Sequence, residues 1–77
     1  MHITDFIQSI EKEFEEVQSG TVAGETEFRQ LEGWSSMMAL IIIAKIDSEY
    51  SVTVTAEELA ECSTINDLFE MVHAKAA

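Results

Sequence analysis

Two adjacent serines, Ser35 and Ser36, are the side chains best placed to do chemistry in this 77-residue chain. They stand where a loop ends and a long apolar run begins, and a serine there usually caps the following helix. With two serines, one hydroxyl can cap while the other points outward. A negatively charged group attached at this place would meet the free N–H groups and the positive dipole end of the helix. The junction therefore suits a phosphodiester, although a plain cap is the commoner role of such a serine.

No other set of side chains forms a recognisable catalytic or metal-binding pattern. His2 and His73 lie near opposite ends of the chain and are interpreted as surface residues. Cys62 has no base nearby in sequence, so we expect a small, mostly buried thiol. The acids do not take calcium-loop spacing, and no glycine-rich loop with a lysine precedes a helix. We therefore expect neither catalysis by the chain itself nor a metal site.

The charge of the chain limits its partners. Fifteen Asp and Glu residues against four Lys and Arg give a formal net charge of −11. Such a surface repels nucleic acids and anionic membranes and attracts basic protein surfaces. The alternative, that the acids only keep a small protein soluble, stays open.

The length of the chain and its cysteine content further limit the class of protein. One cysteine cannot form an internal disulfide. The strongest apolar run, residues 37–44, is shorter than the roughly 20 residues of a membrane span. We expect a single domain over residues 1–77, monomeric and cytoplasmic.

An apolar stripe at helical spacing predicts a first helix over residues 3–18. Thr4 or Asp5 is expected to cap its start. Its opposite face is acidic and includes Glu11, for which we expect surface exposure. The stripe consists of Ile3, Phe6, Ile7, Ile10, Phe14 and Val17.

Residues 19–34 are predicted to form a long loop, because all three glycines of the chain lie there. Phe28, Leu31 and Trp34 recur at every third residue within it. We expect these three side chains to hold the loop on the core through a turn of helix or a pinned loop.

A second helix is predicted over residues 36–50, with Ser35 as its N-cap. The β-branched run 40–43 would also suit a strand, but the length without Gly or Pro favours a helix. The helix is apolar on nearly every side, and so small a domain cannot enclose it. We expect Met38 and Ile41 to be exposed as a partner surface, with burial in the core as the open alternative.

The rest of the chain predicts an extended linker and two more helices. Val52 and Val54 are expected to point inward from the linker. Thr55 and Glu58 fit a capping box that opens a short third helix. Thr64 is expected to cap a fourth helix, whose buried stripe is Ile65, Leu68, Phe69 and Val72. The predicted fold is all-α: a small four-helix bundle of three main helices and one short helix, with a long loop between helices one and two.

With these elements in order, the sequence resembles the acyl carrier proteins over nearly its whole length. Carriers have a first helix, a long loop, an Asp-Ser-Leu motif often preceded by an aromatic residue, and a second helix starting at that serine. Here Trp34-Ser35-Ser36-Met37 stands for the motif. Glu49-Tyr50-Ser51-Val52-Thr53-Val54, Glu57-Glu58-Leu59 and Thr64-Ile65-Asn66-Asp67-Leu68 match the later pattern. The order and spacing of these pieces, together with the acidity, carry the resemblance.

The resemblance implies that Ser36 takes 4′-phosphopantetheine from coenzyme A through a separate phosphopantetheinyl transferase. The terminal thiol of the arm would then carry acyl groups as thioesters between partner enzymes such as a ketosynthase, an acyltransferase or an adenylating enzyme. The chain would be a phosphoprotein of fatty-acid, polyketide or acyl-transfer metabolism, and its apolar helix faces would shelter a growing chain. The implied docking residues are Met37, Met38, Ile41, Asp47, Glu57 and Glu58.

The departures from the family pattern suggest a specialised carrier. Ser35 replaces the usual Asp, and Met37 replaces the usual Leu with similar volume. Met38 and Ile41 stand where relatives usually place acids at the start of the second helix. Because the Asp is missing, a generic transferase is not expected to modify the chain readily. Ser35 is a second, weaker candidate acceptor of phosphopantetheine.

An alternative of another class is an unmodified, carrier-shaped interaction module that uses its apolar second helix. Ser35 in place of Asp and the expected exposure of Met38 motivate it. An acidic decoy of nucleic acid is a weaker idea, because the acids are spread over every segment.

Overall fold

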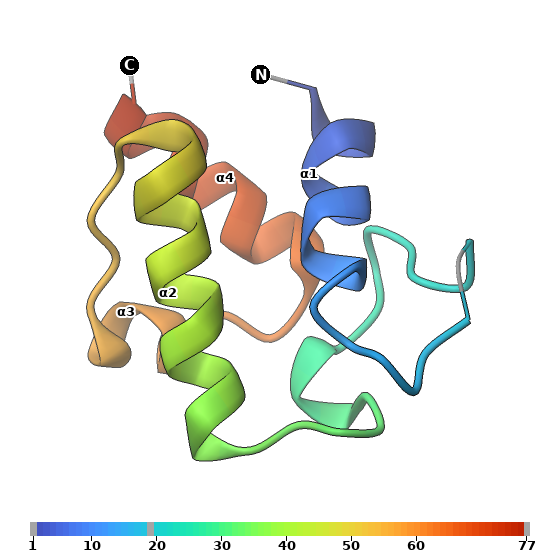
Figure 1. Cartoon of the computed structure of the whole chain (residues 1–77). Helices are drawn as coiled ribbons and strands as arrows, with labels where there is room; N and C mark the ends of the chain where they lie inside the picture. The colour runs from blue at the N-terminus through green and yellow to red at the C-terminus, as the bar shows by residue number, and fades with distance from the viewer. Residues whose placement is uncertain (1, 19, 77) are drawn as a thin grey trace.

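The protein is described by a computed structural model that covers residues 2–18 and 20–76. Four α-helices follow in order: α1 (Ile3–Glu11), α2 (Ser36–Tyr50), α3 (Ala56–Glu61) and α4 (Ile65–Ala76). A 3₁₀ turn, η1 (Phe28–Gln30), interrupts the long connection between α1 and α2 (Figure 1). Within these residues there is no strand, only an isolated bridge between Glu27 and Thr64. The predicted all-α bundle is confirmed.

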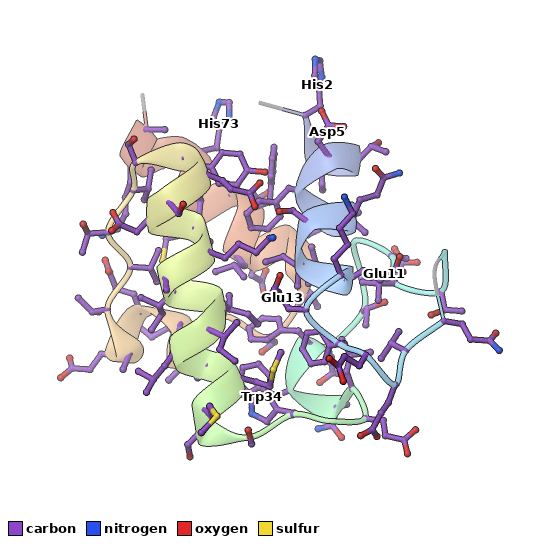
Figure 2. The ribbon with its side chains drawn as sticks, viewed as in Figure 1. His2, Asp5, Glu11, Glu13, Trp34 and His73 are labelled. Carbon is purple, nitrogen blue, oxygen red and sulfur yellow. The ribbon has the colours of Figure 1, made fainter. Side chains whose placement is uncertain are left out.

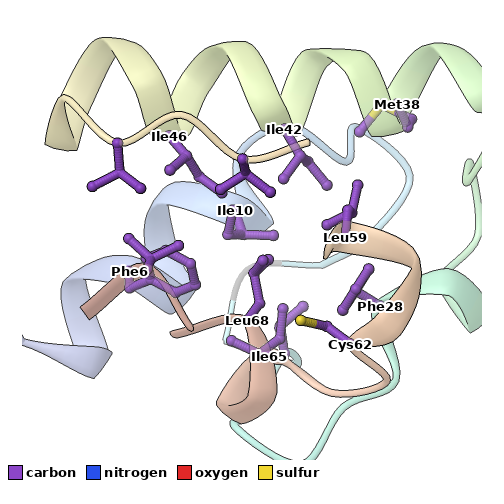
Figure 3. Packing of buried hydrophobic residues seen from close by; sticks show 14 of the residues in the cluster. Phe6, Ile10, Phe28, Met38, Ile42, Ile46, Leu59, Cys62, Ile65 and Leu68 are labelled. Carbon is purple, nitrogen blue, oxygen red and sulfur yellow. The ribbon is translucent and has the colours of Figure 1, made fainter. Parts of the chain in front are cut away.

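The core lies where all four helices meet. α1 packs against α4, and α2 packs against α3 (Figure 1). Val52 and Val54 point inward from the linker, as predicted. Figure 3 shows side chains from each helix and from η1 interdigitating. The buried apolar residues are Phe6, Ile10, Phe14, Val22, Phe28, Met38, Ile42, Ile46, Val52, Val54, Leu59, Cys62, Ile65, Leu68 and Val72.

The first helix is shorter than the sequence predicts. It ends at Glu11, and the amides of Glu13 and Phe14 then make turns to the carbonyls of Ile10 and Glu11 at 3.1 and 3.0 Å. The prediction of a helix to residue 18 was wrong. Carboxylates are unfavourable at a helix C-terminus, and the next residues include Glu13, Glu15 and Glu16.

The start of α1 also differs from the expectation. His2 is its N-cap residue, with extended backbone and no side-chain capping bond. Thr4 and Asp5 lie inside the helix, so neither is the predicted cap. The helix instead depends on its buried face, chiefly Phe6 and Ile10.

Glu11 is buried, against the expectation of an exposed acidic face. Its Oε1 accepts a hydrogen bond from the Gly20 amide at 2.9 Å, and its Oε2 accepts one from the Val22 amide at 2.9 Å. Figure 2 shows the side chain extending from α1 toward the loop. Hydrogen bonds to a charged group are stronger than neutral ones, so this carboxylate organises the loop after α1.

The second half of the loop is held on α4. The amide of Ile65 donates to the Thr26 carbonyl at 3.1 Å, and that of Asn66 donates to the Gly24 carbonyl at 2.8 Å. A Cβ on Gly24 would lie 2.9 Å from Cγ of Asn66, so a larger residue here would have to displace the Asn66 side chain. Phe28 is fully buried and confirms the predicted attachment of the loop to the core.

Local capping motifs set the starts of α3 and α4. Thr55 and Glu58 form the predicted capping box, with bonds of 3.1 and 3.0 Å. The Thr64 hydroxyl accepts from the Asp67 amide at 3.1 Å, as predicted, while the Asp67 carboxylate accepts from the Thr64 amide. The backbone N–H groups of Ser63 and Thr64 lower the pKa of Asp67.

Candidate functional site

Ser35 caps α2, as the sequence predicts. Its backbone is extended, with φ −158° and ψ 173°, and its Oγ accepts a hydrogen bond from the Met38 amide at 3.2 Å. Its carbonyl accepts from the Ala39 amide at 3.1 Å, which is the first helical bond. The Ser35 hydroxyl oxygen is therefore engaged in the N-cap hydrogen bond of α2.

Ser36 is the first residue of α2 and is exposed. Among residues 2–18 and 20–76, its hydroxyl has no hydrogen-bond partner. The amides of Ser36 and Met37 lie in the first turn, where no carbonyl of the helix can reach them. α2 has no acidic residue in this turn. An attached phosphodiester would thus meet unpaired donors and the positive end of a 15-residue helix.

Trp34 fixes the path of the backbone that leads into Ser35 and Ser36. Its ring stacks on Phe14 with centroids 6.3 Å apart and meets the edge of Phe28 at 5.5 Å. Figure 2 shows Trp34 beside the first turns of α2. Gly33 precedes it with φ +93°, a left-handed conformation that favours glycine. A turn and a half-buried indole therefore fix the path of the chain into α2.

A hollow of about 300 Å³ lies between α2 and α3 on the side of Trp34. Ala39, one turn after Ser36, lines it together with Leu59 and two alanines of α3. Arg29 closes one side, and its guanidinium donates to the Leu59 carbonyl at 3.1 Å.

A family model described as a phosphopantetheine attachment site matches residues 5–72. The chain belongs to this family. Its members carry a covalently attached 4′-phosphopantetheine, so the resemblance to acyl carrier proteins is confirmed. Carrier domains of this kind are in general non-catalytic and interact with phosphopantetheinyl transferases and acyl-processing enzymes. Searches of curated proteins and of solved structures found no match to the chain.

Large apolar side chains are exposed on the first half of α2 in this carrier. Met37, Leu40 and Ile41 are 69%, 65% and 36% exposed. We call these three residues the α2 patch. Ile41 is exposed, as predicted, but Met38 is only 9% exposed, so its predicted exposure was wrong.

The helical repeat explains the error. Met38 lies four residues before Ile42 and eight before Ile46, on the stripe that α2 buries. Figure 3 shows Met38 among the packed core side chains. Leu40, which the sequence analysis did not single out, lies on the outward side with Met37.

The three acids predicted for docking differ in exposure. Asp47 and Glu57 are exposed. Glu58 instead belongs to the capping box and pairs with Lys75, whose Nζ lies 2.8 Å from its carboxylate. Lys75 and the Thr55 backbone lower the pKa of Glu58.

The remaining candidates keep their structural interpretation. His2 and His73 are exposed, and the His73 ring lies 5.8 Å from that of Phe69. Burial raises the pKa of the Cys62 thiol. In the described part of this carrier, no three His, Cys, Asp or Glu residues are grouped to hold a metal ion. None of its described helices is long and apolar enough to cross a membrane.

Proposed function

We propose that Ser36 is the attachment residue of this carrier and that its arm transports acyl intermediates as thioesters. One observation supports the choice of serine: the Ser35 hydroxyl is engaged in the helix cap, whereas that of Ser36 is exposed and unbonded among the described residues. In the transfer, Oγ of Ser36 bonds to the phosphorus that carries pantetheine. The phosphoanhydride of coenzyme A breaks, adenosine bisphosphate leaves, and the serine proton passes to a base of the transferase.

The carrier serves a specialised fatty-acid, polyketide or acyl-transfer pathway in this proposal. Ile41 of its α2 patch and the buried Met38 stand where general carriers of the family place acids, and Ser35 replaces their Asp. Dedicated loading and processing enzymes would recognise such a surface. Partner contacts are proposed at Met37, Ile41, Asp47 and Glu57, with Leu40 in place of the buried Met38.

The hollow beside Ala39 supports transient shelter of an attached group. Its volume of about 300 Å³ lies at the low end of small-ligand sites, roughly 300–1,000 Å³. Its lining is mainly apolar, from Trp34, Leu59 and alanines. A short acyl chain fits this space better than a long one.

Intact-mass spectrometry tests the attachment site. The parent chain, Ser36→Ala and Ser35→Ala are each incubated with coenzyme A and a phosphopantetheinyl transferase from the same source. The parent and Ser35→Ala should gain one phosphopantetheine group, and Ser36→Ala should gain none. Modification of Ser36→Ala, or of no variant at all, would refute the assignment.

The second candidate is an unmodified interaction module, and the exposure of Leu40 beside Met37 favours it. It predicts that Ser36→Ala keeps biological function while Leu40→Glu abolishes partner binding. The carrier proposal predicts loss of function in Ser36→Ala, so complementation of a deletion strain separates the two.

A further inference from the structure

We propose that a groove beside the attachment serine receives a partner enzyme that presents an apolar side chain flanked by Lys or Arg. The groove lies between the segment after α1 and the first turns of α2, with a volume of about 330 Å³. We call it the loop–α2 groove. The inference rests on the proposed function, because the expected occupant is an enzyme that acts on the arm at Ser36.

The floor of the loop–α2 groove is apolar and firmly built. Phe14, Met38 and Ile41 line it, together with Gly33. Phe14 stacks on Trp34, and Met38 packs in the core, so both side chains are held by buried neighbours. Ile41 is partly exposed and continues the floor into the α2 patch at Met37 and Leu40.

The rim of the groove is acidic and only partly neutralised. Glu13, Glu15 and Glu16 line it. Glu13 pairs with Lys45, whose Nζ lies 3.0 Å from its carboxylate (Figure 2 shows Glu13 between α1 and α2). Glu15 and Glu16 form no ion pair or hydrogen bond with any residue in 2–18 or 20–76. An apolar floor with two uncompensated carboxylates fits an apolar side chain next to cations.

Most basic residues of the chain are paired elsewhere and do not neutralise the Glu15 and Glu16 carboxylates of this rim. Arg29 bonds to the Leu59 carbonyl, Lys75 to Glu58 and the Thr53 carbonyl, and Lys45 also pairs with Glu49 at 3.0 Å. Lys12 shares a neighbouring hollow with Glu15 without an ion pair between them. Three of the four cations thus join parts of the fold, which leaves Glu15 and Glu16 of the rim to cations from outside.

A protein partner explains these features better than other occupants. α2 has no acid in its first turn, whereas Glu15 and Glu16 line the groove together with Met38 of that turn, so they offer a charged contact there to a basic partner. Anionic lipids and a second copy of this chain, with its charge of −11, would both be repelled. Gly33 precedes Ser36 by three residues and Met38 follows it by two, so an enzyme seated here is next to the arm.

A designed peptide tests the groove without any modification of Ser36. The probe is a fluorescent amphipathic helix with leucines on one face, flanked by lysines, and its binding is followed by anisotropy. The double variant Glu15→Gln/Glu16→Gln removes the rim charge, and Ile41→Ser removes part of the floor. Glu25→Gln/Glu70→Gln is the matched control, because it removes two exposed carboxylates that do not line the groove. Circular dichroism establishes that each variant is folded.

We expect the rim variant and Ile41→Ser each to weaken binding by about fivefold at about 50 mM salt, and the control by less than about twofold. The loss in the rim variant should shrink at about 300 mM salt. In NMR, the peptide should shift the amides around Gly33, Met38 and Ile41.

The inference is overturned if the rim variant and the control weaken binding equally, if Ile41→Ser binds as the parent does, or if the shifts map to α3. Self-association of the chain without peptide would assign the groove to a second copy and overturn it too. Because the peptide assay uses the unmodified chain, its failure leaves the mass test of Ser36 unaffected.

Discussion

Replacing the two adjacent serines one at a time should separate stability from attachment. In the structure, Ser35 Oγ accepts the Met38 amide at 3.2 Å, and Ser36 Oγ has no partner among the described residues. Ser35→Ala therefore removes an acceptor from the first turn of α2. Ser36→Ala removes an exposed hydroxyl and introduces the best helix former.

The expected size of the effect follows from the cap geometry. Loss of an N-cap side chain costs about 0.5–2 kcal/mol, and the 3.2 Å distance is at the long end for such a bond. We expect Ser35→Ala to lower the free energy of unfolding by about 1 kcal/mol and Tm by about 4–8 °C. Ser36→Ala should stay within about 0.5 kcal/mol of the parent. Ser35→Asp should also retain stability, because Asp caps as well as Ser and suits the helix dipole.

Urea unfolding followed by circular dichroism measures these differences, with thermal melts as a second readout. The unmodified chain is used throughout, so any effect of the arm is excluded. Equal stability of Ser35→Ala and the parent would refute the cap as a stabilising contact. A loss in Ser36→Ala as large as that in Ser35→Ala would show that the two hydroxyls have been assigned the wrong roles.

Three further predictions concern buried groups. Ile42→Ala should cost about 2–5 kcal/mol, against a much smaller effect of Leu40→Ala on the same helix, as measured by urea unfolding. Glu11→Ala should cost about 2 kcal/mol and speed hydrogen exchange of the two loop amides it binds; unchanged exchange would contradict its role. Burial raises the pKa of the Cys62 thiol, so the neutral form is favoured in the folded state and its contribution to stability is lost at alkaline pH. Its alkylation by iodoacetamide at about pH 8 should be slow in the folded chain and fast in urea, and equal rates would contradict burial.

Features that depend on neighbours in sequence were predictable. The bounds of α2, the Ser35 cap and the capping box of Thr55 and Glu58 all agree with the prediction. Each involves a hydrogen bond between residues three or four apart, so the local sequence contains both partners. The two adjacent serines also mark the junction in the sequence itself.

Features that depend on distant partners were not predictable in this way. The hydrophobic stripe of the first helix continues to Phe14, yet α1 ends at Glu11, whose carboxylate binds the distant amides of Gly20 and Val22. Phe14 is still buried, but it packs on Trp34 from a turn. The periodicity of the stripe predicts which side chains are buried, but a residue in a turn can be buried as well as one in a helix.

The sequence by itself determined the helical class, the position of the second helix and the two serines at its start, since local hydrogen bonding and apolar spacing specify these. Only the tertiary structure decided which side of that uniformly apolar helix faces water. The stripe of Met38, Ile42 and Ile46 is covered by the other helices, which leaves Met37, Leu40 and Ile41 outside. The tertiary structure also placed Glu15 and Glu16 at the same groove as Ile41, because α1 ends early and the residues after it return toward α2.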